Sequence, residues 1–149
     1  INLSTHSIRY YAKPGAKADS LEENTWKLSG TIAPHSTVVL WFLPEDSTLS
    51  VADFNKHYGT NLVGGKDIII IVGKALPETN PVQLEILNGS KVISRCWYNW
   101  EGAKDVIADK AINFNYPTCY TFTSRVGDVH VAPTPGAIKD GQMPEQITK

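Results

Sequence analysis

The chain has 149 residues, which suits one domain that can bury a core without support from disulfides or metals. Its 14 Lys and Arg nearly balance 15 Asp and Glu, so the net charge is −1. This balance lacks the basic footprint of nucleic-acid binding. The longest apolar run, VVLWFL, is far too short to span a bilayer as a helix. We therefore expect a soluble protein with no nucleic-acid partner and no membrane insertion.

Alternating apolar and polar residues with many β-branched side chains dominate the chain, and this pattern indicates strands. Turn-forming stretches such as KPGAK, PEDS and PETNP separate several of them. The sequence therefore predicts an all-β fold, an antiparallel β-sandwich of which a jelly roll is one form, with one short helix. The expected strands are residues 3–12, 25–32, 37–43, 67–76, 82–87, 91–100, 111–116, 120–126 and 128–131.

One helix is predicted, over residues 51–58. Ser50 can cap its first turn, and Phe54 and Tyr58 share an apolar face with Val51. Gly59 suits the position just after the last turn, where a left-handed conformation is common.

Two strand patterns, TVVLWFL and DIIIIVG, are apolar on both sides. A strand with water on one face alternates instead, so we expect both strands to be central and covered on two sides. The helix over residues 51–58 lies between them in the chain and can provide part of this cover. Because it is only about two turns long, a subunit interface is the alternative, and the pattern predicts self-association.

The clearest local pattern is VQLEILNGSKVISRCW, in which Asn-Gly joins two alternating runs. This dipeptide favours a two-residue hairpin turn, since a type I′ turn needs positive φ at both central residues. With Asn88 and Gly89 as the turn, Leu84 pairs with Ile93. Trp97 then shares a face with aliphatic side chains, and we expect it in the core.

The opposite face of this hairpin carries the candidate ligand-binding residues. Aromatic rings there lie beside polar groups that can orient a ligand. The alternative is that a loop or a second sheet covers these rings, because Trp and Tyr are mostly buried in proteins. The predicted ligand-binding residues are Tyr98, Trp100, Gln83 and Glu85.

No pattern for catalysis, metal binding or a cofactor stands out. The four His have no metal-ligand spacing, GTNLVGGKD fails as a phosphate loop, and no nucleophile motif occurs. Cys96 and Cys119, the two cysteines, can form a disulfide or remain buried thiols, and we favour the thiols. We expect no catalytic residue, no metal and no cofactor.

The end of the chain differs in composition from the rest. Residues 133–149 contain Pro and Gly without an apolar period, which predicts a flexible tail or linker after a β-sandwich domain over residues 1–132. The chain also begins without Met, so we expect a processed chain or a part of a longer protein.

Together these features favour a non-catalytic recognition domain on an extracellular or virion surface. It would bind a glycan or protein receptor through exposed aromatic side chains and loops, as a homo-oligomer or part of a larger assembly. A protruding or shell domain of a viral capsid is a narrower version that rests on fold class alone. The alternative is a small secreted hydrolase with paired carboxylates, for which Glu45, Asp46 and Glu101 are candidates.

Overall fold

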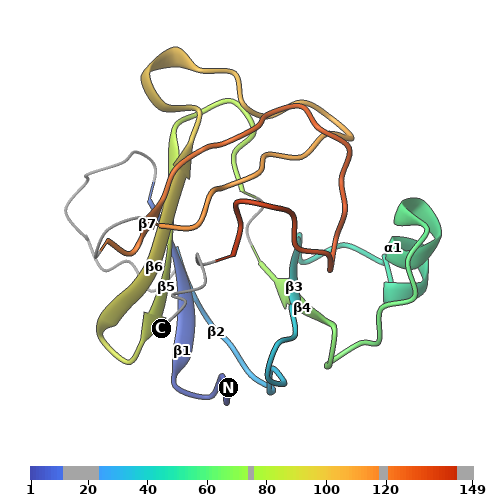
Figure 1. Ribbon diagram of the computed structural model, residues 1–149. Coiled ribbons are helices and arrows are strands. Elements are labelled where there is room, and N and C mark those ends of the chain that lie inside the picture. The colour runs from blue at the N-terminus through green and yellow to red at the C-terminus, as the bar shows by residue number, and fades with distance from the viewer. Residues whose placement is uncertain (12–23, 74–75, 118–120, 144–149) are drawn as a thin grey trace.

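The computed structural model describes residues 1–11, 24–73, 76–117 and 121–143. Their strands form two sheets, one with five strands in the order β2-β1-β5-β6-β7 and one with two strands, β3 and β4 (Figure 1). The described residues are mostly strand and loop, consistent with the predicted all-β class, and they include helix α1 (Val51–Tyr58) and a short 3₁₀ helix, Trp100–Gly102. The strands are His6–Tyr11 (β1), Thr25–Lys27 (β2), Val39–Leu43 (β3), Ile68–Val72 (β4), Val82–Asn88 (β5), Lys91–Tyr98 (β6) and Thr123–Ser124 (β7).

Strand direction differs from the prediction in two places. The neighbours from β2 to β6 pair antiparallel, but β6 with β7 and β3 with β4 are parallel. The prediction of a purely antiparallel fold is therefore wrong for these two pairs. Parallel strands need a crossover connection instead of a tight turn, and α1 lies in the connection between β3 and β4.

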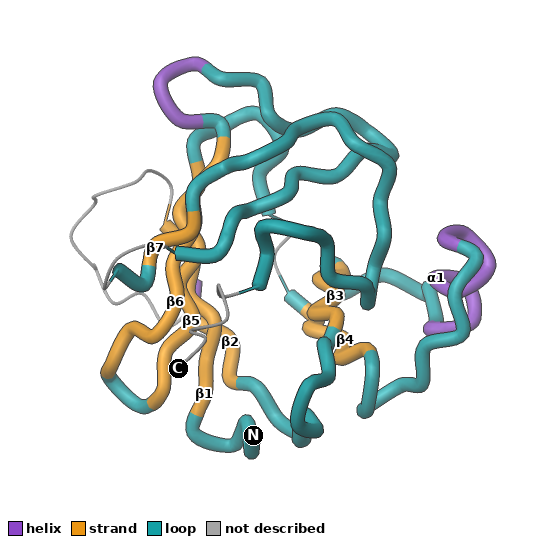
Figure 2. The backbone as a smooth tube through the Cα atoms, viewed as in Figure 1, coloured by secondary structure: helices purple, strands orange, loops and turns teal. Residues whose placement is uncertain are grey.

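The later part of the chain contains less strand than predicted. Most of residues 103–117 and 121–143 run as loops, as Figure 2 shows. The strands expected over residues 111–116, 120–126 and 128–131 are represented by β7 and by two isolated bridges. These bridges join Ala111 with Val131 and Phe114 with Val126, so the two loop segments lie against each other.

Residues of both sheets share one hydrophobic cluster. Ile8 of β1 and Ile71 of β4 are buried in it, and Phe42 of β3 packs against it. The rings of Trp26 and Phe42 meet edge to face, with centroids 5.1 Å apart. A second cluster contains Tyr98, and loop residues between 103 and 117 pack against it.

We call the side of the five-stranded sheet that bears these two clusters the inner face, and the opposite side the outer face.

The two apolar strands are not central, which corrects the prediction. Within the described residues β3 and β4 pair only with each other. Their inner side joins the shared cluster, and on the other side Phe54 of α1 covers Trp41, with ring centroids 4.9 Å apart. The helix covers only part of that side, because Ile70 and Val72 remain 39% and 58% exposed.

The helix itself is confirmed with the predicted bounds. Ser50 and Asp53 form a capping box, in which Ser50 Oγ accepts from the Asp53 amide and the Asp53 carboxylate accepts from the Ser50 amide. Hydrogen bonds from the Ser50 hydroxyl and amide lower the pKa of Asp53. Gly59 ends the helix in the left-handed region, at φ 65°. All of these interactions are local, which explains why the sequence pattern was sufficient.

The β5–β6 hairpin turns one residue later than predicted. Gly89 and Ser90 form the turn, and Asn88 still belongs to β5 and pairs with Lys91. The reason lies in the neighbouring segment, because Thr5 Oγ1 donates to the Asn88 side-chain oxygen at 2.8 Å. The Gly89 amide also donates to the Thr5 carbonyl at 2.8 Å. These bonds extend β5 by one residue.

A β-bulge at Ile93 of β6, opposite Ile86 and Leu87 of β5, shifts the register further. Leu84 consequently pairs with Cys96 and not with Ile93. The offset from the predicted register is odd, so the two faces of the following part of β6 are exchanged. Trp97, expected in the core, is half-buried on the outer face, whereas Tyr98 is buried on the inner face.

The segment predicted as a tail contacts the rest of the chain as far as residue 143. Thr37 Oγ1 donates to the Gly136 carbonyl at 2.6 Å, and the Tyr116 amide donates to the Gly141 carbonyl at 2.7 Å. Residues 144–149 lie outside the described residues. The flexibility of residues 133–149 stays a prediction.

Candidate functional site

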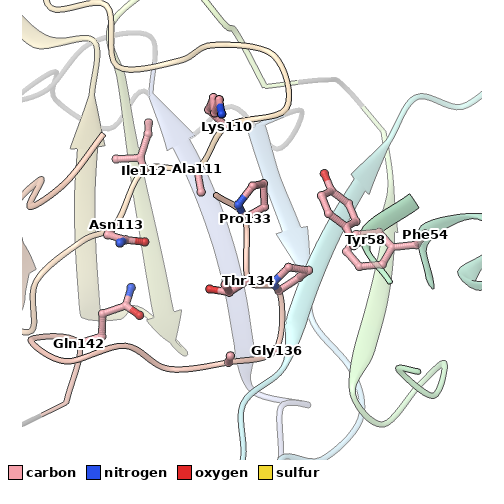
Figure 3. A pocket seen from close by; sticks show the side chains of 12 residues that line it. Phe54, Tyr58, Lys110, Ala111, Ile112, Asn113, Pro133, Thr134, Gly136 and Gln142 are labelled. Carbon is pink, nitrogen blue, oxygen red and sulfur yellow. The ribbon is translucent and has the colours of Figure 1, made fainter. Parts of the chain in front are cut away.

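A candidate site is a pocket between α1 and two loop segments. It has a volume of about 360 Å³, which lies within the range of about 300–1,000 Å³ typical of small-molecule sites. Phe54 and Tyr58 of α1 form one wall, residues 110–113 a second, and residues 133–137 with Gln142 a third. Figure 3 shows the two rings on one side of the pocket and the amides of Asn113 and Gln142 on the other.

The helix positions the aromatic wall. Phe54 and Tyr58 are four residues apart and lie one turn apart on the same side of α1, with ring centroids separated by 4.6 Å. Phe54 is buried against Trp41 and holds Tyr58 in place, while the Tyr58 ring remains 39% exposed. The accessible aromatic surface in this wall therefore belongs mainly to Tyr58.

The polar groups in the other walls are available to a ligand. Across the described ranges, the side chains of Lys110, Asn113 and Thr134 form no hydrogen bond or ion pair. Gln142 uses its side-chain oxygen to accept from the Lys139 amide at 2.9 Å, which leaves its NH₂ group unengaged there. An amide offers both donors and an acceptor, so this pocket can recognise a ligand that carries hydroxyl or amide groups.

The four sequence-predicted ligand residues do not come together in this way. Gln83 and Glu85 are buried on the outer face, Tyr98 is buried on the inner face, and Trp100 lies in the 3₁₀ helix beyond β6. The prediction that they share one exposed face is wrong, because the shifted register separates Tyr98 from Gln83 and Glu85. A ligand-binding role for Trp100, which is 39% exposed, stays a prediction.

Glu85 is instead the centre of an internal polar network. Its strand lies between β1 and β6, so Arg9 and Arg95 flank it in the same register. Arg9 Nη2 lies 2.9 Å from Oε2, and Arg95 Nη2 lies 2.6 Å from Oε1. The Tyr11 hydroxyl donates to Oε2 and the Gln83 amide donates to Oε1, at 3.1 and 3.0 Å. With 2% exposed side chain, Glu85 is an anchor of the sheet and is closed to a ligand.

The electrostatics of this network agree with an ionised Glu85. Burial alone raises the pKa of this carboxyl group, but hydrogen bonds from Arg9, Arg95 and Tyr11 together outweigh it and hold the pKa below its ordinary value. Burial and the nearby Glu85 charge raise the pKa of Tyr11. The tyrosine therefore stays protonated and serves as a donor.

Tyr98 and Cys96 belong to the core. The Tyr98 ring packs in the cluster with Tyr10 and Val82, and its hydroxyl donates to the Pro77 carbonyl at 3.0 Å. Burial raises the pKa of Tyr98 to about 12 and that of Cys96 to about 11. Cys96 is a free thiol, in line with the favoured alternative, and Cys119 lies outside the described residues.

The candidate carboxylates of the hydrolase alternative are exposed and come from two places. Glu45 and Asp46 lie in the turn after β3, and Glu101 lies in the 3₁₀ helix after β6. Figure 2 places that 3₁₀ helix on the far side of the molecule from α1. The structure therefore does not bring Glu101 together with Glu45 and Asp46 across a cleft.

Within residues 1–11, 24–73, 76–117 and 121–143, no group of three or more His, Cys, Asp or Glu side chains could hold a metal ion. Over the same stretches, no helix is long and apolar enough to cross a membrane.

Comparison with known proteins gives one relative and no fold assignment. No family model and no solved structure matches the chain. The Bacillus subtilis (strain 168) protein named Uncharacterized protein YvnB is 28% identical over 158 residues. The match covers 100% of this chain but 12% of that protein's length. A match of this kind transfers no activity, so the function has to be argued from the site.

Sequence reasoning missed the residues that line the pocket. Phe54 and Tyr58 were assigned to the apolar face of the helix, Asn113 to a strand and Gln142 to a flexible tail. No local pattern joins them to Asn113 and Gln142, since the three segments are far apart in the chain.

Proposed function

We propose that the chain is a non-catalytic recognition domain that binds a glycan or a protein receptor through exposed aromatic side chains and loops. The observation that carries this proposal is the pocket that is lined both by the exposed Tyr58 ring and by the amides of Asn113 and Gln142. Of the two ligand classes, the pocket favours a glycan.

The physical reason is the combination of one apolar face with unengaged polar groups. A sugar ring has C–H groups on its faces, which pack against an aromatic ring, and hydroxyl groups around its edge. Amides with both donors and acceptors can bind those hydroxyls and so fix the orientation of the ring. The Tyr58 ring and the two amides supply these two kinds of contact within one pocket.

Two narrower proposals accompany this function. We propose an extracellular or particle-surface location, as expected from the sequence. We also propose that the two sheets are the layers of a β-sandwich, which the hydrophobic cluster shared by Ile8, Phe42 and Ile71 supports. The capsid and hydrolase alternatives have no structural observation that favours them.

A glycan array probed with the whole chain tests the function. We expect binding to at least one glycan class, and Tyr58→Ala should weaken it about five- to tenfold, because an aromatic contact contributes about 1 kcal/mol. Asn113→Ala should weaken it comparably through lost hydrogen bonds. Isothermal titration calorimetry with the glycan that binds measures both effects.

Trp100→Ala is the matched control, because Trp100 and Tyr58 have the same exposed fraction, 39%. If the ligand binds in the Tyr58 pocket, Trp100→Ala leaves the affinity unchanged, whereas the ligand-binding role predicted for Trp100 from the sequence would make the same variant weaken binding. If Trp100→Ala abolishes binding and Tyr58→Ala does not, the ligand binds beside the 3₁₀ helix and our pocket is wrong. Thermal unfolding of each variant separates lost binding from lost folding.

We also propose self-association through the side of β3 and β4 that α1 covers only in part. Ile70 and Val72 are exposed beside Trp41, although parallel sheets are normally covered on both faces. Sedimentation equilibrium should show a concentration-dependent dimer or larger species, and Val72→Lys should shift it toward the monomer. A wild-type chain that stays monomeric at high concentration would exclude this contact.

A further inference from the structure

We propose that the Tyr58 pocket is the middle of a longer groove and that its ligand is an uncharged oligosaccharide of two or more linked units. This inference rests on the function proposed above and narrows its ligand class. It follows from the lining residues that the Tyr58 pocket has in common with two other hollows of the surface.

Two further hollows share lining residues with the Tyr58 pocket. One has a volume of about 350 Å³, and shares Phe54 and Tyr58 with that pocket. Another has a volume of about 430 Å³, and shares Asn113 with it. Each is about as large as the Tyr58 pocket, so a unit that fits the pocket has room for a linked neighbour on either side. A single sugar would leave most of the groove empty.

The two neighbouring hollows differ in chemistry. The first is mostly apolar, since Trp41 and Leu49 line it with the shared rings, although Asp53 and His57 also belong to its lining. The second is polar, and Asn115, Asp128 and Asp140 line it. Among the residues that the structure describes, the side chains of these three form no hydrogen bond or ion pair. An extended ligand would therefore stack at one end and form hydrogen bonds at the other.

The charges along the polar part favour an uncharged ligand. Lys110 lines the Tyr58 pocket, and Lys139 lines the polar hollow together with Asp128 and Asp140. With Asp53 in the hollow beside Trp41, the groove carries two cations and three carboxylates, so negative charge is in excess. A polyanion such as a sulfated or uronic-acid chain would meet these carboxylates, and like charges at an interface oppose binding. Neutral hydroxyl groups can bind to either kind of side chain.

The test is a chain-length series measured by isothermal titration calorimetry with the whole chain. The probes are β-1,4-linked oligomers of glucose, mannose and N-acetylglucosamine, from the monosaccharide to the hexasaccharide, with a galacturonic-acid series for comparison. In at least one neutral series, affinity should rise at least about tenfold from one to four units, which corresponds to about 1.4 kcal/mol. The acidic series should bind more weakly.

Variants of Asn115 in the polar hollow and of Tyr58 in the central pocket show which part of the groove each sugar unit contacts. Asn115→Ala should reduce affinity for the tetrasaccharide and leave that for a single unit unchanged, whereas Tyr58→Ala should reduce both. If every neutral oligomer that binds does so with length-independent affinity, the extended groove is wrong and the recognition function stands. If no glycan binds at any length, both the groove and the proposed glycan function are wrong. Tighter binding of the acidic series would overturn the uncharged ligand class.

Discussion

Glu85→Gln should lower the free energy of unfolding by about 3 kcal/mol, which would be among the largest effects of a single substitution in this protein. Removing one partner of a buried ion pair costs about 3–5 kcal/mol, because the remaining charge is left uncompensated. Arg9 and Arg95 both rely on Glu85 and are 20% and 30% exposed, so the lower end of that range applies. Gln has nearly the same size, so a cavity would not explain the loss.

Urea unfolding of the variant measures this effect as a lower midpoint with an unchanged slope. Glu45→Gln is the matched control, since it removes an exposed carboxylate and should change stability by no more than about 0.5 kcal/mol. A change below about 1 kcal/mol for Glu85→Gln would mean that the network contributes little to folding.

The pH dependence of stability in the wild type and in Glu85→Gln tests the direction of the pKa shift of Glu85. The pKa of Glu85 in the folded chain lies below its ordinary value of 4.5. A lowered folded-state pKa stabilises the protein above the unfolded-state pKa, and this contribution is lost as pH falls through the folded-state pKa. The stability difference between wild type and Glu85→Gln should therefore be full at neutral pH and shrink progressively below about pH 4.5.

Tyr98→Ala should lower the free energy of unfolding by about 3–5 kcal/mol, the usual cost of removing a buried aromatic ring. The Tyr98 side chain is 8% exposed and packs with Tyr10 and Val82. Its hydroxyl also donates to the Pro77 carbonyl, so Tyr98→Phe alone should cost about 1 kcal/mol. Urea unfolding distinguishes the two variants.

Trp100→Ala should be nearly silent in the same measurement, because that ring is 39% exposed and lies beyond the strand. Trp97→Ala should fall between the two, since Trp97 is half-buried on the outer face. A large loss for Trp97→Ala with little effect of Tyr98→Ala would restore the register predicted from the Asn-Gly turn.

The candidate site was beyond the reach of sequence patterns for a physical reason. Tyr58 is placed by a helix that local interactions define, but Asn113 and Gln142 reach the pocket through loops. Those loops are held by long-range bonds, such as the one from the Thr37 hydroxyl to the Gly136 carbonyl. Periodicity reports neighbours within one element and contains no information on which loops meet.

The sequence by itself determined the all-β class, the approximate positions of β1 to β6 and the bounds of α1. These depend on side-chain alternation and on hydrogen bonds between residues a few positions apart, such as those between Ser50 and Asp53. Only the tertiary structure decided the register of the hairpin, because Thr5 forms hydrogen bonds with the Asn88 side chain and the Gly89 amide. These bonds keep Asn88 in the strand and out of the turn. The tertiary structure also decided that β3 and β4 pair with each other, because an apolar strand fits many partners and contacts from distant segments select one.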